Sequence, residues 1–230
     1  MTVKKNKKEK EGQIQAGSLT DQAYKVLEEM ISTLQLAPGS VISESALAQN
    51  LGIGRTPVRE ALQGLAREGL VVILPRKGIL VSEINPGSQL LVLEVRRELE
   101  RLMVRAASQR ATDKERKQFL EIAAGMKKAA KENDDINFMR LDRIFNQLLA
   151  SAAHNEYASR SMRLMNGLSR RFWYVHYRES ADLPLCARLH AAVAERIAKG
   201  DTEGAADASD RLVDYAETFT RATLETRNIR

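Results

Sequence analysis

Apolar residues recur at helical spacing over most of the chain, but the length of the patterned segments changes near residue 83. Before that point the segments are short. Helical patterns over about 21–34, 44–50 and 57–68 are followed by two β-prone runs, 71–74 and 79–81. A basic turn joins the two runs and predicts a hairpin. The order of elements is therefore helix, helix, tight turn, helix and hairpin.

The ends of the three short helices carry residues that favour caps. Thr20, Ser43 and Thr56 precede the three patterns and are predicted N-caps, because their hydroxyl groups can accept a hydrogen bond from the first turn. Pro57 would then occupy the first helical position, where its missing N–H costs nothing, and Gly69 would end the third helix. These residues fix where each helix is expected to begin and end.

The second half of the chain has a helical pattern almost throughout. Asn85, Pro86 and Gly87 form turn dipeptides that separate it from the first half. Six helical segments are expected, near 88–109, 113–132, 135–152, 155–179, 184–199 and 202–226. Helices of this number and length can enclose a core and leave a pocket between them.

The predicted fold is mainly α, with an N-terminal winged helix-turn-helix (three helices plus a β-hairpin wing) followed by an all-α bundle of about six helices. The expected parts are a basic disordered tail at 1–16, the winged domain at 17–82, a linker at 83–88 and an all-helical domain at 89–230. The tail is expected to be disordered because its lysine-rich segment is too charged to bury.

Composition and charge narrow the class of protein. The chain has 230 residues, a formal net charge of +6 and a pI near 9.5, which favours polyanionic partners without identifying one. It contains no run of about eighteen apolar residues, so no membrane span is expected, and its charged N-terminus lacks the apolar core of a secretory signal. Cys186 is the only cysteine, which excludes an internal disulfide and suits the cytoplasm.

The third helix carries residues suited to DNA. A recognition helix fits the major groove and presents its first turn to bases and phosphates, and here that turn holds Arg55, Thr56 and Arg59. Arginine can bind guanine with two donors or clamp a phosphate, and Thr56 can donate to a phosphate at the positive helix end. The alternative is a helical bundle with merely solvated arginines. The Thr-Pro-x-Arg order between a tight turn and a basic hairpin favours DNA binding.

The hairpin tip is a second candidate contact with DNA. It places two cations next to a glycine, and a basic tip without a side chain at the glycine suits the DNA backbone or the minor groove. The six predicted DNA-binding residues are therefore Arg55, Thr56, Arg59, Arg76, Lys77 and Gly78.

Polar side chains interrupt the apolar stripes of the predicted bundle at three positions. Arg96, Asp142 and His190 each have apolar residues at helical spacing on the same face. Buried charges are costly unless they are paired, ligated or solvated, so three of them in one small domain indicate a shared polar cavity. Asn146 can join the cavity from one turn after Asp142. Alternatively each is a satisfied polar group of the core, and Arg96 pairs with Glu100.

The first half of the chain resembles the GntR family of regulators over about 17–82. The resemblance rests on Leu36-Ala37-Pro38-Gly39-Ser40-Val41-Ile42-Ser43-Glu44, Leu47-Ala48, Leu51-Gly52-Ile53-Gly54-Arg55-Thr56-Pro57-Val58-Arg59-Glu60-Ala61-Leu62, Leu65, Glu68-Gly69-Leu70-Val71 and Arg76-Lys77-Gly78. It implies a DNA-binding winged helix-turn-helix. It also implies contacts with DNA at Arg55, Thr56, Arg59 and the wing glycine Gly78.

The second half is similar to the FCD domain, the effector-binding domain of the FadR subgroup of that family, over about 88–226. The matching stretches are Glu94-Val95-Arg96 with Leu99-Glu100, Asp142-Arg143-Ile144-Phe145, Asn155, and His190 with Ala198-Lys199-Gly200-Asp201. The resemblance implies a domain that dimerises. It also implies a domain that often holds a divalent metal through one Asp and three His, with the metal helping to bind a carboxylate effector.

This sequence departs from the implied metal pattern. Asp142 and His190 match it, but Asn146 and Leu212 stand where the resemblance implies histidines. Asn ligates zinc-like ions weakly, so the incomplete set argues against a tightly bound transition metal and leaves Asp142 and His190 as the candidate ligands of a divalent ion. We expect instead that Arg96 grips the carboxylate of an effector directly, with hydrogen bonds from Asn146 and His190.

The expected function is that of a sequence-specific DNA-binding transcriptional regulator, with repression as the mode that the family implies. A small organic acid would control it from a site formed by Arg96, Asp142, Asn146 and His190. A homodimer would place two recognition helices about one DNA turn apart on a roughly palindromic operator. Two alternatives remain. The helical domain only dimerises, or Asp142 and His190 form the acid–base pair of an enzyme, which the absence of a nucleophile elbow or phosphate-binding glycine loop disfavours.

Overall fold

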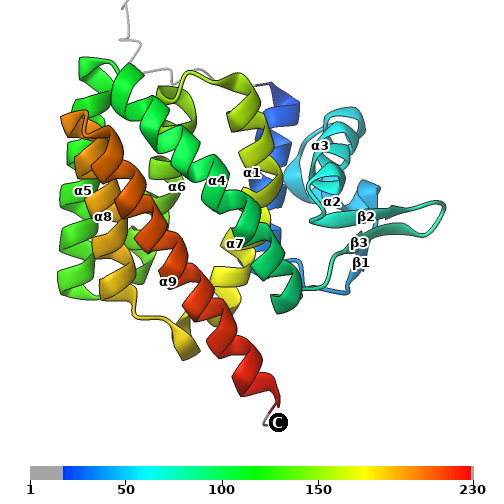
Figure 1. Cartoon of the computed structure of the whole chain (residues 1–230). Helices are drawn as coiled ribbons and strands as arrows, with labels where there is room; N and C mark the ends of the chain where they lie inside the picture. Colours follow the sequence, from blue (N-terminus) through cyan, green and yellow to red (C-terminus); the bar gives the residue numbers. More distant parts are fainter. Residues whose placement is uncertain (1–17, 229–230) are drawn as a thin grey trace, which may run out of the picture.

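The computed structural model describes residues 18–228, apart from the side chains of 178–180 and 225–228. Short elements come first and six long helices follow, in the predicted order (Figure 1). We call residues 18–82 the head and residues 86–228 the helical domain. The predicted basic tail, 1–16, lies outside the described residues.

The head contains three helices and a small sheet. Its elements are α1 (Leu19–Ser32), β1 (Val41–Ile42), α2 (Glu44–Leu51), α3 (Arg55–Arg67), β2 (Val71–Leu74) and β3 (Gly78–Val81). Strands β2 and β3 form the predicted antiparallel hairpin, with Val71 opposite Val81 and Leu74 opposite Gly78. The sequence predicts only this hairpin, but β1 adds a third strand along β3, which gives the order β1-β3-β2. Two residues are too few to show an alternating pattern.

Helix α1 begins earlier than the sequence predicts because Ser18, and not Thr20, caps it. The Ser18 hydroxyl accepts from the Asp21 N–H at 3.1 Å, and the Asp21 carboxylate accepts from the Ser18 N–H at 3.1 Å. This reciprocal capping box satisfies two backbone donors, which a cap at Thr20 alone would not do. The predicted cap Ser43 is confirmed at the start of α2.

One apolar core holds the head together. Helices α1 and α3 bury the faces that carry Leu27, Ile31, Val58, Leu62 and Leu65, each no more than 2 % exposed. Burial of each such side chain stabilises the fold by roughly 1.5–3 kcal/mol. Helix α1 lies between α3 and the helical domain (Figure 1). The packing of α1 on α3 therefore leaves the other side of α3 open to solvent.

The helical domain consists of six helices within the described residues. They are α4 (Pro86–Arg110), α5 (Asp113–Glu132), α6 (Asp135–Ala152), α7 (Glu156–Ser180), α8 (Leu183–Lys199) and α9 (Thr202–Asn228). The bounds of α5 and α6 agree with the predicted ranges, and the other helix ends differ by no more than two residues. Helix α4 begins inside the predicted linker, because the Asn85 side chain caps it and Pro86 is tolerated at the first helical position.

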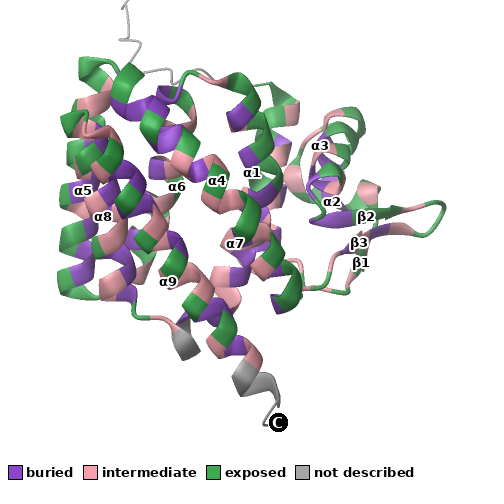
Figure 2. Cartoon of the chain, viewed as in Figure 1, coloured by how far each residue is buried: buried purple, intermediate pink, exposed green. Residues whose placement is uncertain are grey.

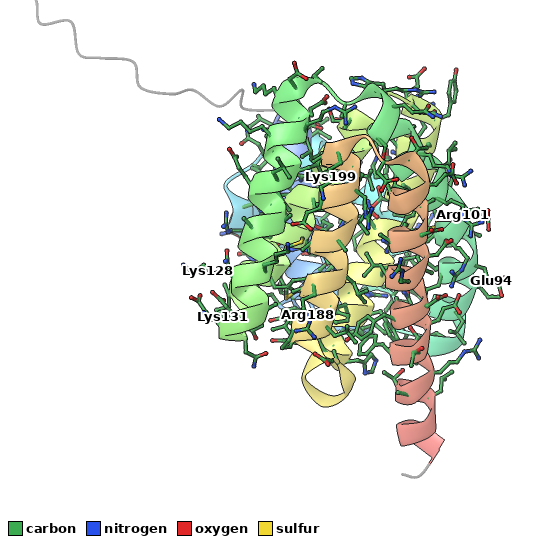
Figure 3. The ribbon with its side chains drawn as sticks, turned by 60° about the vertical axis from the view of Figure 1, so that its left-hand side comes forward. Glu94, Arg101, Lys128, Lys131, Arg188 and Lys199 are labelled. Carbon is green, nitrogen blue, oxygen red and sulfur yellow. The ribbon has the colours of Figure 1, made fainter. Side chains whose placement is uncertain are left out.

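All six helices contribute to the core of the helical domain. Within it the rings of Phe119 and Phe145 meet edge to face, with centroids 6.0 Å apart. Buried residues follow the inward faces of the helices (Figure 2), whereas Lys128, Lys131 and Arg188 point to solvent from α5 and α8 (Figure 3). None of the helices between residues 18 and 228 combines the length and the apolar character that crossing a membrane requires.

Helix α7 of the helical domain packs directly against the head. At Gly167 the two parts approach so closely that a Cβ atom would lie 2.6 Å from Leu70 Cδ1. The buried Arg171 donates to the backbone oxygens of Ser82 at 2.7 Å and Glu83 at 3.0 Å. These bonds fix the segment that connects the two parts, so the head rests on α7.

Candidate functional site

The first candidate site is the exposed start of α3. Gly54 precedes the helix and has no capping side chain, so Arg55 is the first helical residue and Thr56 the second, not the predicted N-cap. The prediction was wrong because Pro57 is tolerated throughout the first turn, where no N–H has an intrahelical acceptor. The side chains of Arg55, Thr56 and Arg59 are all exposed. The uncapped N–H groups and the positive end of the helix dipole suit a phosphate.

Glu44, the first residue of α2, holds two of these side chains in place. Arg59 donates from Nε and Nη2 to its carboxylate at 3.0 and 2.9 Å, and Arg55 Nε lies 3.7 Å from Oε1. The hydrogen bond from Arg59 keeps the pKa of Glu44 below its usual value of 4.5. The arginine side chains remain 57 % (Arg59) and 66 % (Arg55) exposed, so solvent screens both contacts and phosphate can replace the carboxylate. Sequence alone does not reveal Glu44, because its role depends on how α2 crosses α3.

The hairpin turn presents the other predicted cations. Arg76 and Lys77 are exposed at a tip that projects away from the helical domain (Figure 1). Gly78 has a φ of +110°, and a Cβ atom there would lie 2.8 Å from the backbone oxygen of Ile42. The pairing of β1 with β3 therefore requires a glycine at this position, and a contact between Gly78 and DNA stays a prediction.

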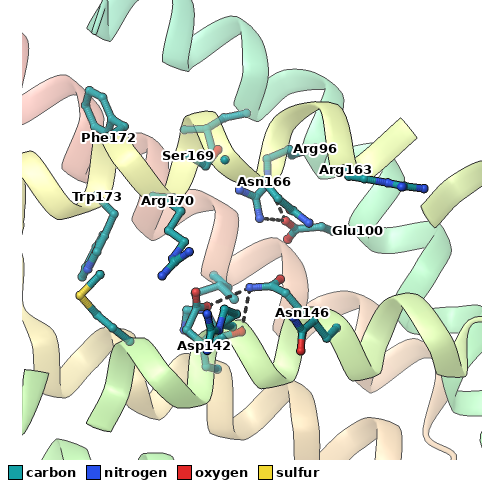
Figure 4. A pocket seen from close by; sticks show the side chains of 18 of the residues that line it. Arg96, Glu100, Asp142, Asn146, Arg163, Asn166, Ser169, Arg170, Phe172 and Trp173 are labelled. Carbon is teal, nitrogen blue, oxygen red and sulfur yellow. Dashed lines mark hydrogen bonds and ion pairs between the residues drawn. The ribbon is translucent and has the colours of Figure 1, made fainter. Parts of the chain in front are cut away.

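The second candidate site is a cavity of about 860 Å³ between helices of the helical domain and α1 of the head. Its volume lies in the range of small-molecule pockets. The four residues of the predicted effector site, Arg96, Asp142, Asn146 and His190, all line it. Figure 4 shows Asp142 and Asn146 on α6, across the cavity from Arg96 on α4. The structure therefore gathers these four side chains around one space.

A partly buried ion pair lies in the cavity wall, with the side chains of His190 and Asp142 12 and 24 % exposed. His190 Nε2 lies 3.1 Å from Asp142 Oδ1, and its Nδ1 donates to the backbone oxygen of Cys186 at 2.9 Å. Burial opposes a charge on His190, but contacts with Cys186 and Asp142 outweigh it and hold the pKa of His190 well above 6.5. Burial likewise opposes the charge of Asp142, but the hydrogen bond from His190 keeps the pKa of Asp142 below 3.8. The contact between the two side chains therefore favours the charged form of each.

Asn146 and Arg96 also bond to protein groups. Asn146 Nδ2 donates to the Asp142 backbone oxygen at 2.9 Å and to Asp142 Oδ1 at 3.1 Å. Arg96 donates from Nε and Nη2 to Glu100 Oε1 at 2.8 and 2.5 Å, and these two side chains are 15 and 11 % exposed. The alternative that Arg96 pairs with Glu100 is confirmed. An incoming carboxylate must share Arg96 with Glu100 or displace it.

The cavity does not fit the metal site that the family resemblance implies. Asp142 and His190 bond to each other, and Asn146, where a histidine is implied, offers only an amide and donates it to Asp142. Leu212, where a histidine is implied, lines the cavity with an apolar side chain. Within the described residues no three His, Cys, Asp or Glu side chains are placed to hold an ion.

The cavity also contains residues that were not predicted. Arg163 and Arg170 of α7 add two cations, and Trp173 adds an aromatic wall (Figure 4). Asn166 Oδ1 and Trp173 Nε1 are buried without a hydrogen-bond partner among the described residues. Such atoms are costly unless a ligand or water meets them. Only Asn166 carries a signal in the sequence, as a polar residue inside the apolar segment 162–172.

Helix α1 of the head forms part of the cavity wall. Lys25 and Glu28 of α1 line the cavity, as does Arg170 of α7. Arg170 donates from Nη1 to Glu28 at 2.7 Å and from Nη2 to Glu29 at 2.5 Å. We call this contact the α1–α7 seam. A ligand in the cavity therefore lies against the first helix of the head as well as against the helical domain.

Two family models match the chain in the order of its two parts. The model of the bacterial regulatory proteins of the gntR family matches residues 19–81, and that of the FCD domain matches residues 91–215. The chain belongs to the GntR family. The FCD domain places this GntR-family protein among the FadR-type regulators, in agreement with the sequence resemblance.

Relatives of this GntR-family protein are HTH-type transcriptional regulators. It is 50 % identical over 64 residues to a regulator from an unstable DNA locus of Streptomyces ambofaciens, a match that spans 28 % of this chain and 27 % of that protein. It is 25 % identical to the transcriptional repressor RspR of Escherichia coli K12 over 80 % of each chain. The solved structure of E. coli McbR/YncC superposes with a TM-score of 0.75 at 20 % identity, over 91 % of this chain and 100 % of that chain, and so shares the fold.

These matches establish a DNA-binding transcriptional regulator of the GntR family. The family comprises regulators and not enzymes, so the enzyme alternative built on Asp142 and His190 does not hold. The roles of individual residues at α3, at the wing and in the cavity stay predictions.

Proposed function

We propose that this GntR-family regulator is a homodimeric repressor that binds a roughly palindromic operator and releases it when a small organic acid enters the cavity. The observation that carries the proposal is the cavity itself, because its wall includes α1 of the head as well as helices of the helical domain. A ligand there contacts both parts and can favour one arrangement of them over another. The protein would act in the cytoplasm, where bacterial DNA lies.

The lining of the cavity favours an organic acid as effector. Cationic side chains from four helices line it, among them Arg96, Arg163 and Arg170. Guanidinium groups form charge-assisted, often bidentate hydrogen bonds with carboxylates. Aromatic residues around Trp173 form another part of the wall. The effector is therefore expected to combine a carboxylate with an apolar or ring-shaped part.

The head is proposed to bind the operator through the start of α3 and the tip of the wing. Arg55 and Arg59 would exchange Glu44 for bases or phosphates in the major groove, while Thr56 donates to a phosphate at the helix end. The basic tip of the wing would follow the DNA backbone or the minor groove. Both surfaces lie on the side of the head that faces away from the helical domain (Figure 1), so a duplex can reach them.

A second copy of the chain is proposed to pack against α4. Leu91, Val95 and Leu102 lie on one stripe of this helix and are 63, 53 and 48 % exposed. Aligned apolar residues of this kind commonly mark an interface, and two-fold packing of α4 on α4 would bury them. The double variant Val95→Glu with Leu102→Glu should be monomeric by light scattering, whereas Glu94→Gln on the same helix should stay dimeric. A dimeric double variant would contradict this interface.

An operator titration with and without acid tests the proposed function. Operator DNA is selected from a random pool by the purified protein, and its dissociation constant is measured by fluorescence anisotropy with citrate and with 4-hydroxybenzoate. Trp173 is the only tryptophan of the chain and lines the cavity, so its fluorescence reports acid binding directly. The proposal predicts that an acid that changes this fluorescence also weakens the operator complex. If acids changed neither signal, the helical domain would be a dimerisation domain alone.

A further inference from the structure

The α1–α7 seam contains an arginine that two carboxylates of the head hold in place. Arg170 of α7 donates to Glu28 at 2.7 Å and to Glu29 at 2.5 Å. Arg143 of α6 adds a longer contact, with Nη1 3.4 Å from Glu29 Oε2. The head is thus tied to the helical domain by charge, at a point far along the sequence from the connecting segment.

The guanidinium of Arg170 is also turned toward the cavity. Arg170 and Glu28 are both lining residues, and Figure 4 shows the Arg170 side chain pointing from α7 toward Asp142. Against the cost of burial, it joins His190 and Arg96 in keeping the pKa of Asp142 low. A carboxylate ligand in the cavity can therefore reach Arg170 while every helix stays intact.

Burial makes this contact sensitive to a competing anion. The side chains of Arg170 and Glu28 are 15 and 14 % exposed, so water screens this pair less than an exposed one, and loss of either partner leaves a partly buried charge unpaired. An anion that takes Arg170 leaves Glu28 next to a second negative charge in the same cavity. Like charges at short range repel strongly where water is scarce. The repulsion would move α1 away from α7.

A second arginine keeps the head attached when the seam opens. Arg171 holds the backbone oxygens of Ser82 and Glu83, and it does not line the cavity. A ligand in the cavity has no direct access to these bonds. These bonds would keep the head attached at residues 82–83 if the seam opened.

We propose that Arg170 is the effector sensor of this protein: a carboxylate ligand takes its guanidinium from Glu28 and Glu29, opens the α1–α7 seam and lets the head turn so that the operator is released. The inference rests on the proposed function and adds the residue that carries the signal. Because the two binding events are linked, operator-bound protein must bind the acid more weakly, by the same factor.

Three variants separate this role from a merely structural one. Arg170→Gln removes the guanidinium that senses the acid. The double variant Glu28→Gln with Glu29→Gln removes the two carboxylates that compete with the acid for that guanidinium. Arg160→Gln is the matched control, because it removes the same charge from an exposed position of α7, where the side chain is 68 % exposed. Each variant is titrated with citrate and with 4-hydroxybenzoate while Trp173 fluorescence and operator anisotropy are recorded.

The two sides of the seam should respond in opposite directions. We expect the Glu28→Gln, Glu29→Gln protein to bind the acid roughly tenfold more tightly than wild type, and Arg170→Gln to bind it roughly tenfold more weakly, the effect of one charge-assisted hydrogen bond. Arg160→Gln should match wild type. Without acid, both seam variants should bind the operator more weakly than wild type, and acid should no longer change the operator affinity of Arg170→Gln.

The outcomes distinguish failure of the inference from failure of the proposed function. Equal acid affinities of wild type and the double glutamate variant would show that the acid does not compete with Glu28 and Glu29 for Arg170. This result can be read even if Arg170→Gln does not fold. Acid binding and operator release that persist unchanged in Arg170→Gln would overturn the inference and leave the proposed function standing. If neither acid binds wild type at millimolar concentration, both fall.

Discussion

Arg59 and Arg170 each donate to glutamate side chains at hydrogen-bond distance, but the two contacts lie in different surroundings. Arg59 meets Glu44 at the surface of the head, where the arginine side chain is 57 % exposed. Arg170 meets Glu28 between α1 and α7, where the arginine side chain is 15 % exposed. Water screens the second contact less than the first, so the same chemical pair has two uses. At the surface it orients an arginine that phosphate can take over, and at the seam it links two parts of the protein.

The largest expected effect compares the stability of two matched variants. Arg170→Met should lower the free energy of unfolding by about 2–3 kcal/mol, somewhat less than the 3–5 kcal/mol of a fully buried pair, because it leaves Glu28 without a cation. Arg59→Met should leave the urea unfolding midpoint unchanged, because Glu44 is solvated without it. Urea denaturation followed by circular dichroism measures both. Equal losses of unfolding free energy in the two variants would show that the surface pair and the seam pair contribute equally to stability.

Direct contact with the operator should depend on Arg59 and not on Arg170, which is the reverse of their expected contributions to stability. Arg59→Ala should weaken binding of the selected operator roughly 10- to 100-fold if the side chain reads a base. Arg67→Ala, at the exposed far end of the same helix, removes an equal charge and should have little effect. Fluorescence anisotropy at fixed salt gives both constants. An unchanged footprint of Arg59→Ala would exclude its role in recognition.

Substitution of Gly78 tests whether the fold or a contact with DNA requires glycine at this position of the wing. Gly78→Ala should destabilise the protein by about 2 kcal/mol, because the left-handed backbone is strained and the Ile42 oxygen is too close. Gly52→Ala should cost only about 1 kcal/mol, since its φ is also positive but nothing lies within 4 Å. Both values come from urea unfolding. A fully stable Gly78→Ala protein with lost operator binding would assign the glycine to DNA instead.

The smallest effect concerns the pH dependence of the His190–Asp142 pair. The raised pKa of His190 gives stabilisation that is complete below 6.5 and is lost as the pH rises through that raised value. The lowered pKa of Asp142 gives stabilisation that is present above 3.8 and is lost as the pH falls through that lowered value. The difference in melting temperature between wild type and Asp142→Asn should therefore peak between pH 3.8 and 6.5. A difference that kept growing above neutral pH would mean that His190 is neutral.

Much of the head could be predicted because its signals are local. Arg55, Thr56 and Arg59 lie within one stretch of chain, and the cap Ser43 and the terminator Gly69 lie beside the helices that they bound. The two wrong N-caps lie close to the correct ones. Ser18 and not Thr20 caps α1, and Gly54 and not Thr56 precedes α3. Strand β1 was not predicted because it pairs with β3 over a long stretch of sequence and is too short to show an alternating pattern.

The cavity could be predicted only in part, for a different physical reason. Arg96, Asp142 and His190 stand out because a charge within an apolar stripe requires a partner. Arg170 and Glu28 do not, because they are 142 residues apart and each stands beside a second residue of the same charge, as on a solvated helix face. Only the packing of α7 on α1 turns those two charged residues into a partly buried pair. The connection between the two parts of the molecule therefore belongs to the tertiary structure alone.

Hydrogen exchange of the α1 amides shows whether an acid in the cavity acts on the head. The protein is labelled in deuterated buffer with and without the acid that changes Trp173 fluorescence, and peptides from α1 (Leu19–Ser32) are compared with peptides from α5 (Asp113–Glu132). We predict faster exchange in α1 with acid, no change in α5, and fast exchange in α1 of Arg170→Gln even without acid. Slower exchange in α6 and α7 together with unchanged α1 would show that the acid binds without acting on the head, and would contradict the account.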